Sequence, residues 1–367
     1  MGDLSAVTAR LATLEELEDG DLEACVGLLE AAFGGWPPQP VGVSAVEHLR
    51  WKFEVPGPLP ARMHLLELDG RLVALGLYLP RVFRIHGKVE LANEGVDAAV
   101  HPDLQGQGLY SRRLELKASQ ADQGYQFTVN FTSHRLRPRT LSGWRPEVVP
   151  GQPRSLVRAR DVWRVPALRV PPERRRRGYP LVPAAIEALR TWPGLRRRAS
   201  QPSGCQIRSV DQFDQRFDAL FEAAASQYDF VLERGHVWLN WRYADPRAGG
   251  HEILVAERDD ELLGYAVYRR SSRGGMLMDL LVAPGREDVA AALLDTALAE
   301  LKDRDSVSCW ASPGSAFEAL AFSRGFLDVG YESEMALRTI ACGPELFAPF
   351  ERTDGRVHVM PGDSDLL

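Results

Sequence analysis

In the segment 96-VDAAVHPDLQGQGLYSRRLELKA-118, a strand-like run passes through a proline and two glycines directly into a helical pattern. Backbone N–H groups at a helix start have no partner within the helix, and the helix dipole favours an anion there. Gly106 and Gly108 would let a phosphate approach the main chain, although glycine also serves any tight turn. The order of strand, glycine loop and helix favours an anion-binding loop over a plain turn.

The residues after the glycines exclude two common phosphate loops. A Walker loop requires Gly-Lys-Ser/Thr at the helix start, whereas here Gly108 is followed by Leu109, Tyr110 and Ser111. A dinucleotide-binding fingerprint requires a third glycine and an acidic residue about 20 positions later. The sequence meets neither requirement well.

The same order of features occurs twice in the chain. Each copy has a Trp-basic-aromatic triplet, a hairpin-like segment, a strand ending in Val-X-Pro, an apolar-periodic helix, a further strand and a Gly-aromatic pair. The distance from the proline to the glycine is 41 positions in both copies, from Pro102 to Gly143 and from Pro284 to Gly325. This repetition predicts two similar domains.

Length and composition agree with two globular domains. The 367 residues exceed the usual size of one domain, and 45% hydrophobic with 26% charged residues is ordinary for a chain with well-formed cores. We assign residues 1–160 to an N-terminal domain, 161–203 to a Pro/Arg-rich linker, 204–345 to a C-terminal domain and 346–367 to a tail. The expected fold class is α/β, built as α+β mixed sheets with flanking helices.

The charge pattern narrows the range of partners. A net charge of -6 gives no general reason to expect nucleic acid or an anionic membrane. The runs Arg174 to Arg177 and Arg196 to Arg198 lack interleaved aromatic residues, so a solvated linker face is favoured over an anion-binding patch. The first residues contain no apolar signal segment, and no apolar run approaches the length of a membrane span. We expect a cytoplasmic protein without nucleic-acid or membrane partners, and leave a homodimer open.

The four cysteines give no metal-binding pattern. They lie far apart, with no CxxC and no histidine at metal spacing. Cys25 falls on the apolar stripe of a predicted helix, which favours a buried free thiol. We expect no structural metal.

The glycine loop and its surroundings resemble motif A of the GNAT superfamily of acyl-CoA-dependent N-acyltransferases. In that motif a strand is followed by Gln/Arg-x-x-Gly-x-Gly/Ala, which corresponds here to Gln105, Gly106, Gln107, Gly108, Leu109 and Tyr110. The pair Gly143-Trp144 is similar to the family's segment after the second helix, and Asn130 to its polar residue at the end of the fifth strand. The resemblance covers residues 1 to about 160 in motifs and about 204 to 340 in architecture.

The resemblance implies a binding mode for acetyl-CoA or a related thioester in the N-terminal domain. The main chain from Ala98 to Val100 would pair with the pantetheine arm, because GNAT sheets splay open beside the fourth strand. Amides from Gly106 to Ser111 would hold the pyrophosphate, and Arg112 and Arg113 would either add charge near it or remain solvated. The predicted coenzyme-binding residues are Ala98, Ala99, Val100, Gln105, Gly106, Gln107, Gly108, Leu109, Tyr110, Ser111 and Asn130.

The second copy lacks the glycines. Pro284 is followed by Gly285-Arg286-Glu287-Asp288, in which two carboxylates would repel a pyrophosphate. We expect the C-terminal domain to be a structural or substrate-shaping copy without coenzyme.

Acyl transfer to an amine requires a proton acceptor, because an alkyl ammonium has a pKa near about 10.4. The resemblance implies a carboxylate on the fourth strand, and Glu94 stands 11 residues before Gln105 at the matching position. Glu94 projects to the same side as Ala98 if no bulge intervenes, whereas Asp97 projects to the other side and is the second candidate. The alternative for Glu94 is a strand-end carboxylate that faces water.

The acid for the leaving thiolate is less defined. Many relatives carry a tyrosine four residues before the Gly-aromatic pair, and this sequence has Arg139 there. Candidates by proximity are Tyr110, Tyr125, Ser133 and His134, and departure without a dedicated acid is the alternative. The Tyr110 ring shares a helical stripe with apolar residues, so packing beneath the loop is favoured over a catalytic hydroxyl.

Two further features lie near the expected acceptor cleft. The basic group formed by His134, Arg135, Arg137 and Arg139 would coat the surface, or hold an acidic acceptor or the coenzyme's 3'-phosphate. The tandem arrangement is similar to that of mycothiol synthases and of aminoglycoside acetyltransferases of the enhanced-intracellular-survival type. In the latter group the C-terminal carboxylate can enter the active site, which implies a role for Leu367.

The sequence is therefore compatible with two functions. The first is an N-acetyltransferase acting on a primary amine of a small molecule or peptide. The second is a catalytically inactive GNAT scaffold that binds acyl-CoA or a protein partner, which Arg139 and the degenerate second copy favour. The sequence does not name the acceptor, since this fold serves many substrates.

Overall fold

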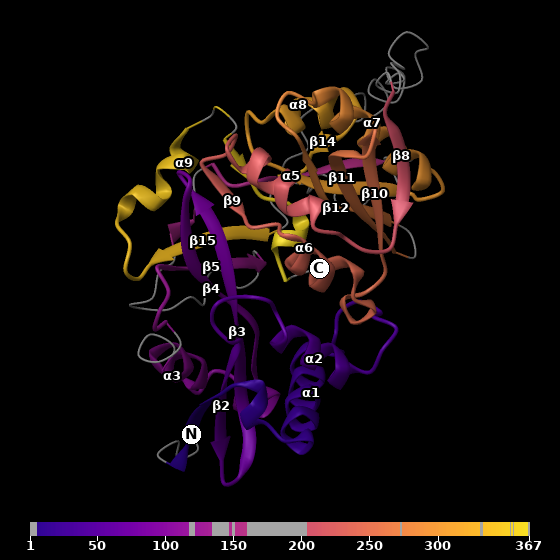
Figure 1. The fold of residues 1–367 in the computed structure, drawn as a ribbon. Coiled ribbons are helices and arrows are strands. Elements are labelled where there is room, and N and C mark those ends of the chain that lie inside the picture. The colour runs from indigo at the N-terminus through magenta and orange to yellow at the C-terminus, as the bar shows by residue number, and fades with distance from the viewer. Residues whose placement is uncertain are drawn as a thin grey trace, which may run out of the picture.

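The computed structural model describes residues 6–116, 122–133, 147–148, 151–159, 204–271, 274–330, 333–352, 354 and 356–365. Over these residues the chain forms two mixed β-sheets, one of nine strands and one of seven, with helices packed against them. The sheets belong to two halves of the molecule, and the end of the described chain lies between the halves (Figure 1). The predicted fold class, mixed sheets with flanking helices in two repeated units, is confirmed.

The first sheet has the order β1-β2-β3-β4-β5-β15-β6, and β9 and β16 extend it from the edge of β3. Its pairs are antiparallel, except that β4 runs parallel to β5 and β16 runs parallel to β9. Its strands are β1 (Thr8–Ala12), β2 (Arg62–Leu68), β3 (Arg71–Ile85), β4 (Lys88–Val100), β5 (Phe127–Ser133), β6 (Glu147–Val148), β9 (Phe230–Leu232), β15 (Ser333–Thr339) and β16 (Val357–His358).

The second sheet has the order β14-β7-β13-β12-β11-β10-β8, with β12 and β13 parallel. The succession β10, β11, β12, α7 and β13 repeats the succession β2, β3, β4, α3 and β5, so the predicted duplication is present. The strands are β7 (Arg154–Ala159), β8 (Gln206–Val210), β10 (His251–Arg258), β11 (Glu261–Arg270), β12 (Gly274–Val282), β13 (Ser306–Ala311) and β14 (Leu327–Asp328).

The two sheets exchange one strand each. Strand β7 belongs to the range 1–160 by sequence but lies between β13 and β14 of the second sheet. Strand β15 belongs to the range 204–345 but pairs with β5 over its whole length. Each predicted domain therefore completes the sheet of the other.

Helices α1 (Asp19–Phe33) and α2 (Ala45–Phe53) cover one face of the first sheet, and α3 (Leu109–Leu116) covers the other. Helix α2 begins with a capping box, in which Ser44 accepts from Glu47 N at 3.2 Å and Glu47 accepts from Ser44 N at 2.9 Å. The apolar stripe of α1 is buried and includes Cys25, whose burial raises its pKa to about 12. The predicted buried thiol is confirmed.

The remaining helices belong mainly to the second half. No described helix is both long and apolar enough to cross a lipid bilayer. The other helical segments are η2 (Leu14–Glu16), η3 (Pro102–Leu104), α5 (Arg216–Ala225), α6 (His236–Leu239), the π-helical η10 (Asn240–Ala244), η11 (Pro246–Ala248), α7 (Glu287–Glu300), α8 (Ala316–Ser323), η12 (Pro344–Phe347), α9 (Ala348–Glu351) and η13 (Pro361–Asp363).

Some predicted features lie outside the described residues. These features are the pair Gly143-Trp144, the basic group from His134 to Arg139, the linker arginines and Leu367.

Candidate active site

Strand β4 carries a bulge at Asp97 and Ala98. Leu77 of β3 pairs with Val96 and Leu75 pairs with Ala99, so two residues of β4 stand opposite one residue of β3. Asp97 adopts a positive φ of 48°, a conformation in which Asp is more common than most other residues. The expectation that Glu94 and Ala98 project to the same side of β4 assumed a regular strand. The bulge makes this expectation wrong, because Ala99 projects to the side of Glu94 in place of Ala98.

Strands β4 and β5 diverge beside this bulge. They pair only from Ala92 to Glu94 on β4, although β4 continues to Val100. Asn130 is the first β5 residue beyond the last pair; it is buried, and its Nδ2 has no hydrogen-bond acceptor among the described residues. The predicted coenzyme edge, Ala98 to Val100, lies beyond the point of divergence, and the Asn130 amide could donate to a ligand carbonyl there.

The glycine loop follows the end of β4. Gly106 and Gly108 have φ angles of 79° and 93°, and a Cβ on either would meet no atom within 4 Å. Backbone conformation, and not lack of room, therefore requires glycine. The first helical hydrogen bond of α3 runs from Arg112 N to Gly108 O, so the amides of 109–111 belong to the first turn, where a helix offers donors to an anion.

Two glutamines of the motif hold the loop. Gln105 Nε2 donates to Val100 O and Gln107 Nε2 donates to Asp103 O, each at 3.4 Å. Leu109 is buried against the sheet. These contacts position the loop without using its amides.

Arg113 and Tyr110 lie together on α3. The guanidinium of Arg113 is buried, donates to the Tyr78 hydroxyl and lies 4.9 Å from the centre of the Tyr110 ring. Gly76 makes room for it, since a Cβ there would clash with the guanidinium. The expectation of a solvated Arg113 side chain is therefore wrong. The Tyr110 ring is half-buried and packs against this cation.

Glu94 is buried and does not face water. Arg81 contacts its Oε2 through Nε at 2.7 Å and Nη2 at 2.6 Å, and the main-chain N–H of Asp365 donates to Oε1 at 3.2 Å. The alternative of a solvated strand-end carboxylate is therefore wrong.

Asp97 lies in the same cluster, since the bulge turns it toward α2. Trp36 Nε1 donates to Asp97 Oδ1 at 3.0 Å, and Lys52 Nζ donates to Oδ2 at 2.5 Å. The same ammonium donates to Asp365 Oδ2 at 2.6 Å, so Lys52 bridges two carboxylates. Its side chain is only 4% exposed, which makes these bonds strong in their dry surroundings.

The cluster contains three carboxylates, Glu94, Asp97 and Asp365, and two cations, Arg81 and Lys52. Burial raises the pKa of Glu94 and of Asp97, and their cations oppose this only in part. Burial alone would lower the pKa of Lys52, but Asp365 and Asp97 raise it, so the ammonium is retained. Buried carboxylates with raised pKa values are suited to accept a proton near neutral pH.

Asp365 reaches the cluster because two buried arginines hold the segment 357–365. Arg234 contacts the Asp363 carboxylate through Nη2 at 2.7 and 2.8 Å. Arg242 donates to Gly362 O and to Ser364 O, both at 2.9 Å. The segment thus runs from the second half of the molecule to the carboxylates on β4.

The repeated Trp-basic-aromatic triplets meet at the junction of the halves. The rings of Trp51 and Trp241 stack with centroids 4.8 Å apart at 14°. Each indole N–H donates to the main-chain oxygen of the other tryptophan, at 2.8 and 2.9 Å. The basic residues that follow, Lys52 and Arg242, both bind the 357–365 segment. The triplets are recognisable in the sequence as markers of duplication, and their central basic residue is the signal that could have indicated this role.

The remaining predicted residues lie apart from the cluster. Tyr125 precedes the paired region of β5, at the end of the strand remote from the divergence, and burial raises its pKa to about 12. In the second half, Arg286 pairs with Asp288 at 2.9 Å at the start of α7, where the first half has its glycines.

No protein-family model matches the sequence. Among curated proteins, a mycothiol acetyltransferase from Acidimicrobium ferrooxidans is 33% identical over 147 residues, which cover 35% of this chain and 47% of that protein. The chain thus spans about half the length of the curated relative that it matches.

Solved structures share the fold over most of the chain. A GCN5-related N-acetyltransferase from Kribbella flavida has a TM-score of 0.58 at 14% identity, covering 93% of this chain and 73% of that one. N-myristoyltransferase from Saccharomyces cerevisiae, solved with bound myristoyl-CoA and inhibitors, has a TM-score of 0.57 at 14% identity, covering 98% and 88%. Structural similarity at 14% sequence identity establishes the fold alone. The chain therefore shares its overall fold with these acyltransferases, and it carries two similar units in tandem.

Proposed function

We propose that this protein is an acyl-CoA-dependent N-acyltransferase that acylates a primary amine of a small molecule or peptide, with acetyl-CoA as the first donor to test. One observation carries the proposal. Strands β4 and β5 diverge at a point that adjoins both the glycine loop at the end of β4 and the buried carboxylate cluster that includes Glu94 and Asp97. The names of the relatives, acetyl- and myristoyltransferases, support acyl transfer.

The coenzyme would be held by main-chain groups. Ala98 to Val100 offer the strand edge, the amides of 106–111 offer donors to phosphate, and Asn130 offers its side-chain amide. Bound in this way, acyl-CoA supplies an activated thioester. The main-chain N–H at Ala98, at the bulge, is the donor that we assign to the thioester carbonyl.

Glu94 is the residue that we assign to take the proton from the acceptor's ammonium. Both Arg81 contacts go to Oε2, so Oε1 is the less engaged oxygen. Asp97 is the second candidate, since Trp36 and Lys52 each engage one of its oxygens. Tyr110 remains a candidate for protonating the leaving thiolate, and Arg113 lies against its ring.

Release of free thiol from acetyl-CoA in the presence of a panel of amines and peptides tests the proposal. We expect turnover in the unmodified protein and a loss of about 10²- to 10⁴-fold in kcat for Glu94→Gln. Glu90→Gln, on the same strand and side, is the matched control and should change kcat less than about twofold. Coenzyme binding without thiol release for every acceptor would support the scaffold function instead.

A further inference from the structure

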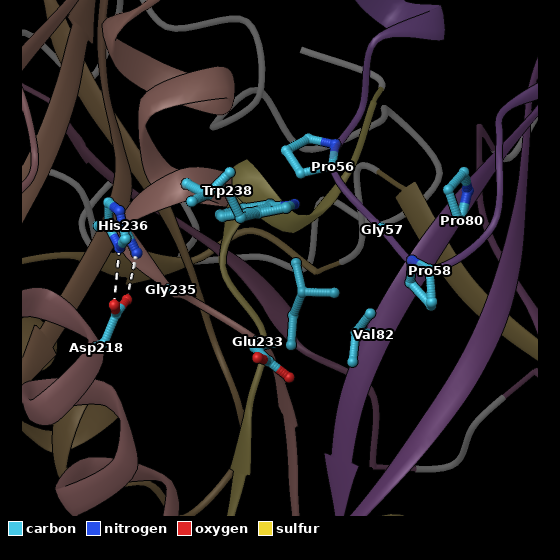
Figure 2. Close-up of a pocket in the computed structure, with 12 residues that line it drawn as sticks. Pro56, Gly57, Pro58, Pro80, Val82, Asp218, Glu233, Gly235, His236 and Trp238 are labelled. Atoms are coloured by element: carbon cyan, nitrogen blue, oxygen red, sulfur yellow. Dashed lines mark hydrogen bonds and ion pairs between the residues drawn. The ribbon is translucent and has the colours of Figure 1, made fainter. Parts of the chain in front are cut away.

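A cavity of about 400 Å³ lies between the two halves (Figure 2). Pro58 lies beside Pro80 and Val82 of β3 on the side of the first half, and His236 and Trp238 of α6 lie on the side of the second (Figure 2). Asp218, His236 and Glu233 contribute the ionisable groups. None of the five residues of the carboxylate cluster lines it.

The position of the cavity follows from the strand pairing of β3. On one edge, β2 pairs with β3 up to Tyr78 and β9 pairs with it from Phe83, which leaves the interval at Pro80 to Val82 between them. Strand β4 pairs with the opposite edge. The cavity and the coenzyme edge of β4 therefore lie on different sides of β3, and ligands in the two places need not compete.

The lining combines apolar surface, an indole ring and acidic groups. The twelve lining residues include Asp218 and Glu233 but no lysine or arginine. Asp218 is engaged, because its carboxylate accepts from His236 N and contacts His236 Nδ1, both at 2.7 Å. This pair fixes the start of α6 and thereby the position of Trp238.

Glu233 is half-buried and shares its nearest cation with Glu222. Its nearest cation is Arg84, whose Nε lies 3.6 Å away, while Nη2 of the same guanidinium contacts Glu222 at 2.7 Å. Burial raises the pKa of Glu233, and the charges of Glu222 and Asp218 raise it further, while Arg84 opposes both effects. A cation that entered the cavity would offset this unfavourable charge.

We propose that this cavity binds an organic cation, with an ammonium or guanidinium group against Glu233 and the Trp238 ring and an apolar body against the prolines and Val82. Tryptophan is the aromatic side chain that attracts cations most strongly. Charge complementarity selects this occupant over a neutral or anionic one. The site is separate from the acyl-transfer centre, and its occupancy does not depend on turnover.

The cavity wall has a physical connection to the carboxylate cluster. The ring centroids of Trp238 and Trp241 are 6.3 Å apart. The centroid of the Trp241 ring lies 5.6 Å from Cζ of Arg81, whose guanidinium pairs with Glu94. The cation can therefore come from two sources: a second charged group on the acceptor, or a free effector.

Isothermal titration calorimetry with three probes of one shape tests the proposal. Phenethylammonium should bind, while 2-phenylethanol and 3-phenylpropionate should bind at least about tenfold more weakly, since neither carries a cation for Glu233 and the Trp238 ring. Glu233→Gln should weaken phenethylammonium binding by a similar factor, and Trp238→Phe by less. Glu23→Gln removes an exposed carboxylate on α1, outside the lining, and should change the affinity less than about twofold.

Equal binding of the three probes, or equal effects of Glu233→Gln and Glu23→Gln, would overturn the proposal, provided that thermal unfolding shows both variants to be folded. Once binding is established, steady-state kinetics separates the sources: competition with the acceptor indicates the acceptor's own second charge, and a non-competitive effect indicates an effector. A protein that binds phenethylammonium but never releases thiol would contradict the proposed acyl transfer and leave this site intact.

Discussion

Asp97 joins backbone conformation to charge at a single residue. Its positive φ forms the bulge, and the bulge directs its carboxylate to Lys52 and Trp36. Glu94 could be selected from the sequence because its spacing to the glycine loop resembles a known motif, and Asp97 was the second candidate on the same strand. Lys52 and Asp365 could not, because 313 positions separate the two residues that share one ion pair. Only the folded course of the 357–365 segment brings them together.

Replacement of Lys52 by methionine tests the cluster as a set of coupled charges. Lys52→Met keeps the side chain's length but leaves Asp97 and Asp365 without their shared cation. We expect a loss of about 3 to 5 kcal/mol in the free energy of unfolding at neutral pH, measured by urea denaturation. Lys52→Arg should retain more of the stability, since it keeps the positive charge.

The pH dependence follows from the raised pKa of Asp97. The folded chain holds this proton more tightly than the unfolded chain, so stability is highest below the unfolded value near 3.8 and falls as pH rises through the folded value. Lys52→Met removes the opposing cation, which should raise this pKa further, so the total fall should be larger and extend to higher pH. Urea titrations of Lys52→Met that show a constant deficit at every pH would contradict the charge assignment.

At the scale of elements, the duplication was predictable and the strand exchange was not. Recurring features at one spacing indicated two similar units, because local sequence sets local structure. The partner of a strand depends on distant residues, and nothing in the composition of β7 or β15 specifies which sheet each one joins. The bulge escaped prediction for the same reason, since it is a property of register between β3 and β4.

The tryptophan pair is the most symmetric contact between the repeated elements. Trp51→Phe and Trp241→Phe each remove one indole N–H that bonds to the partner's main chain. We expect each change to cost about 1 to 2 kcal/mol of unfolding free energy, because a buried carbonyl loses its donor. Since the rings also stack, the double variant should deviate from additivity by at least about 0.5 kcal/mol in a double-mutant cycle. Strict additivity would show that the two bonds form independently.

At the scale of the whole molecule, the halves behave as one structure. Strand β7 completes the second sheet, β15 completes the first, and the 357–365 segment ends against β4. Core residues of both halves, including Trp51 and Trp241, belong to one buried cluster.

Separation of the halves should therefore prevent folding. Residues 1–160 alone would expose the edge of β5 that pairs with β15, and residues 204–367 alone would expose the edge of β13 that pairs with β7. We expect the full chain to unfold in one cooperative transition by calorimetry, and each piece to lack such a transition. Two pieces that each unfold cooperatively would show that the exchanged strands are dispensable.

The stoichiometry and location of acyl-CoA binding distinguish one coenzyme site in the first half from a site in each half. Gly106 and Gly285 are matched, with φ angles of 79° and 70° and open space where a side chain would point. Glutamate at either position imposes the same backbone strain and adds the same charge. By isothermal titration calorimetry we expect one acetyl-CoA per chain, a loss of binding in Gly106→Glu and unchanged binding in Gly285→Glu. Two sites per chain, or equal losses in the two variants, would contradict a single coenzyme site at the glycine loop of the first half.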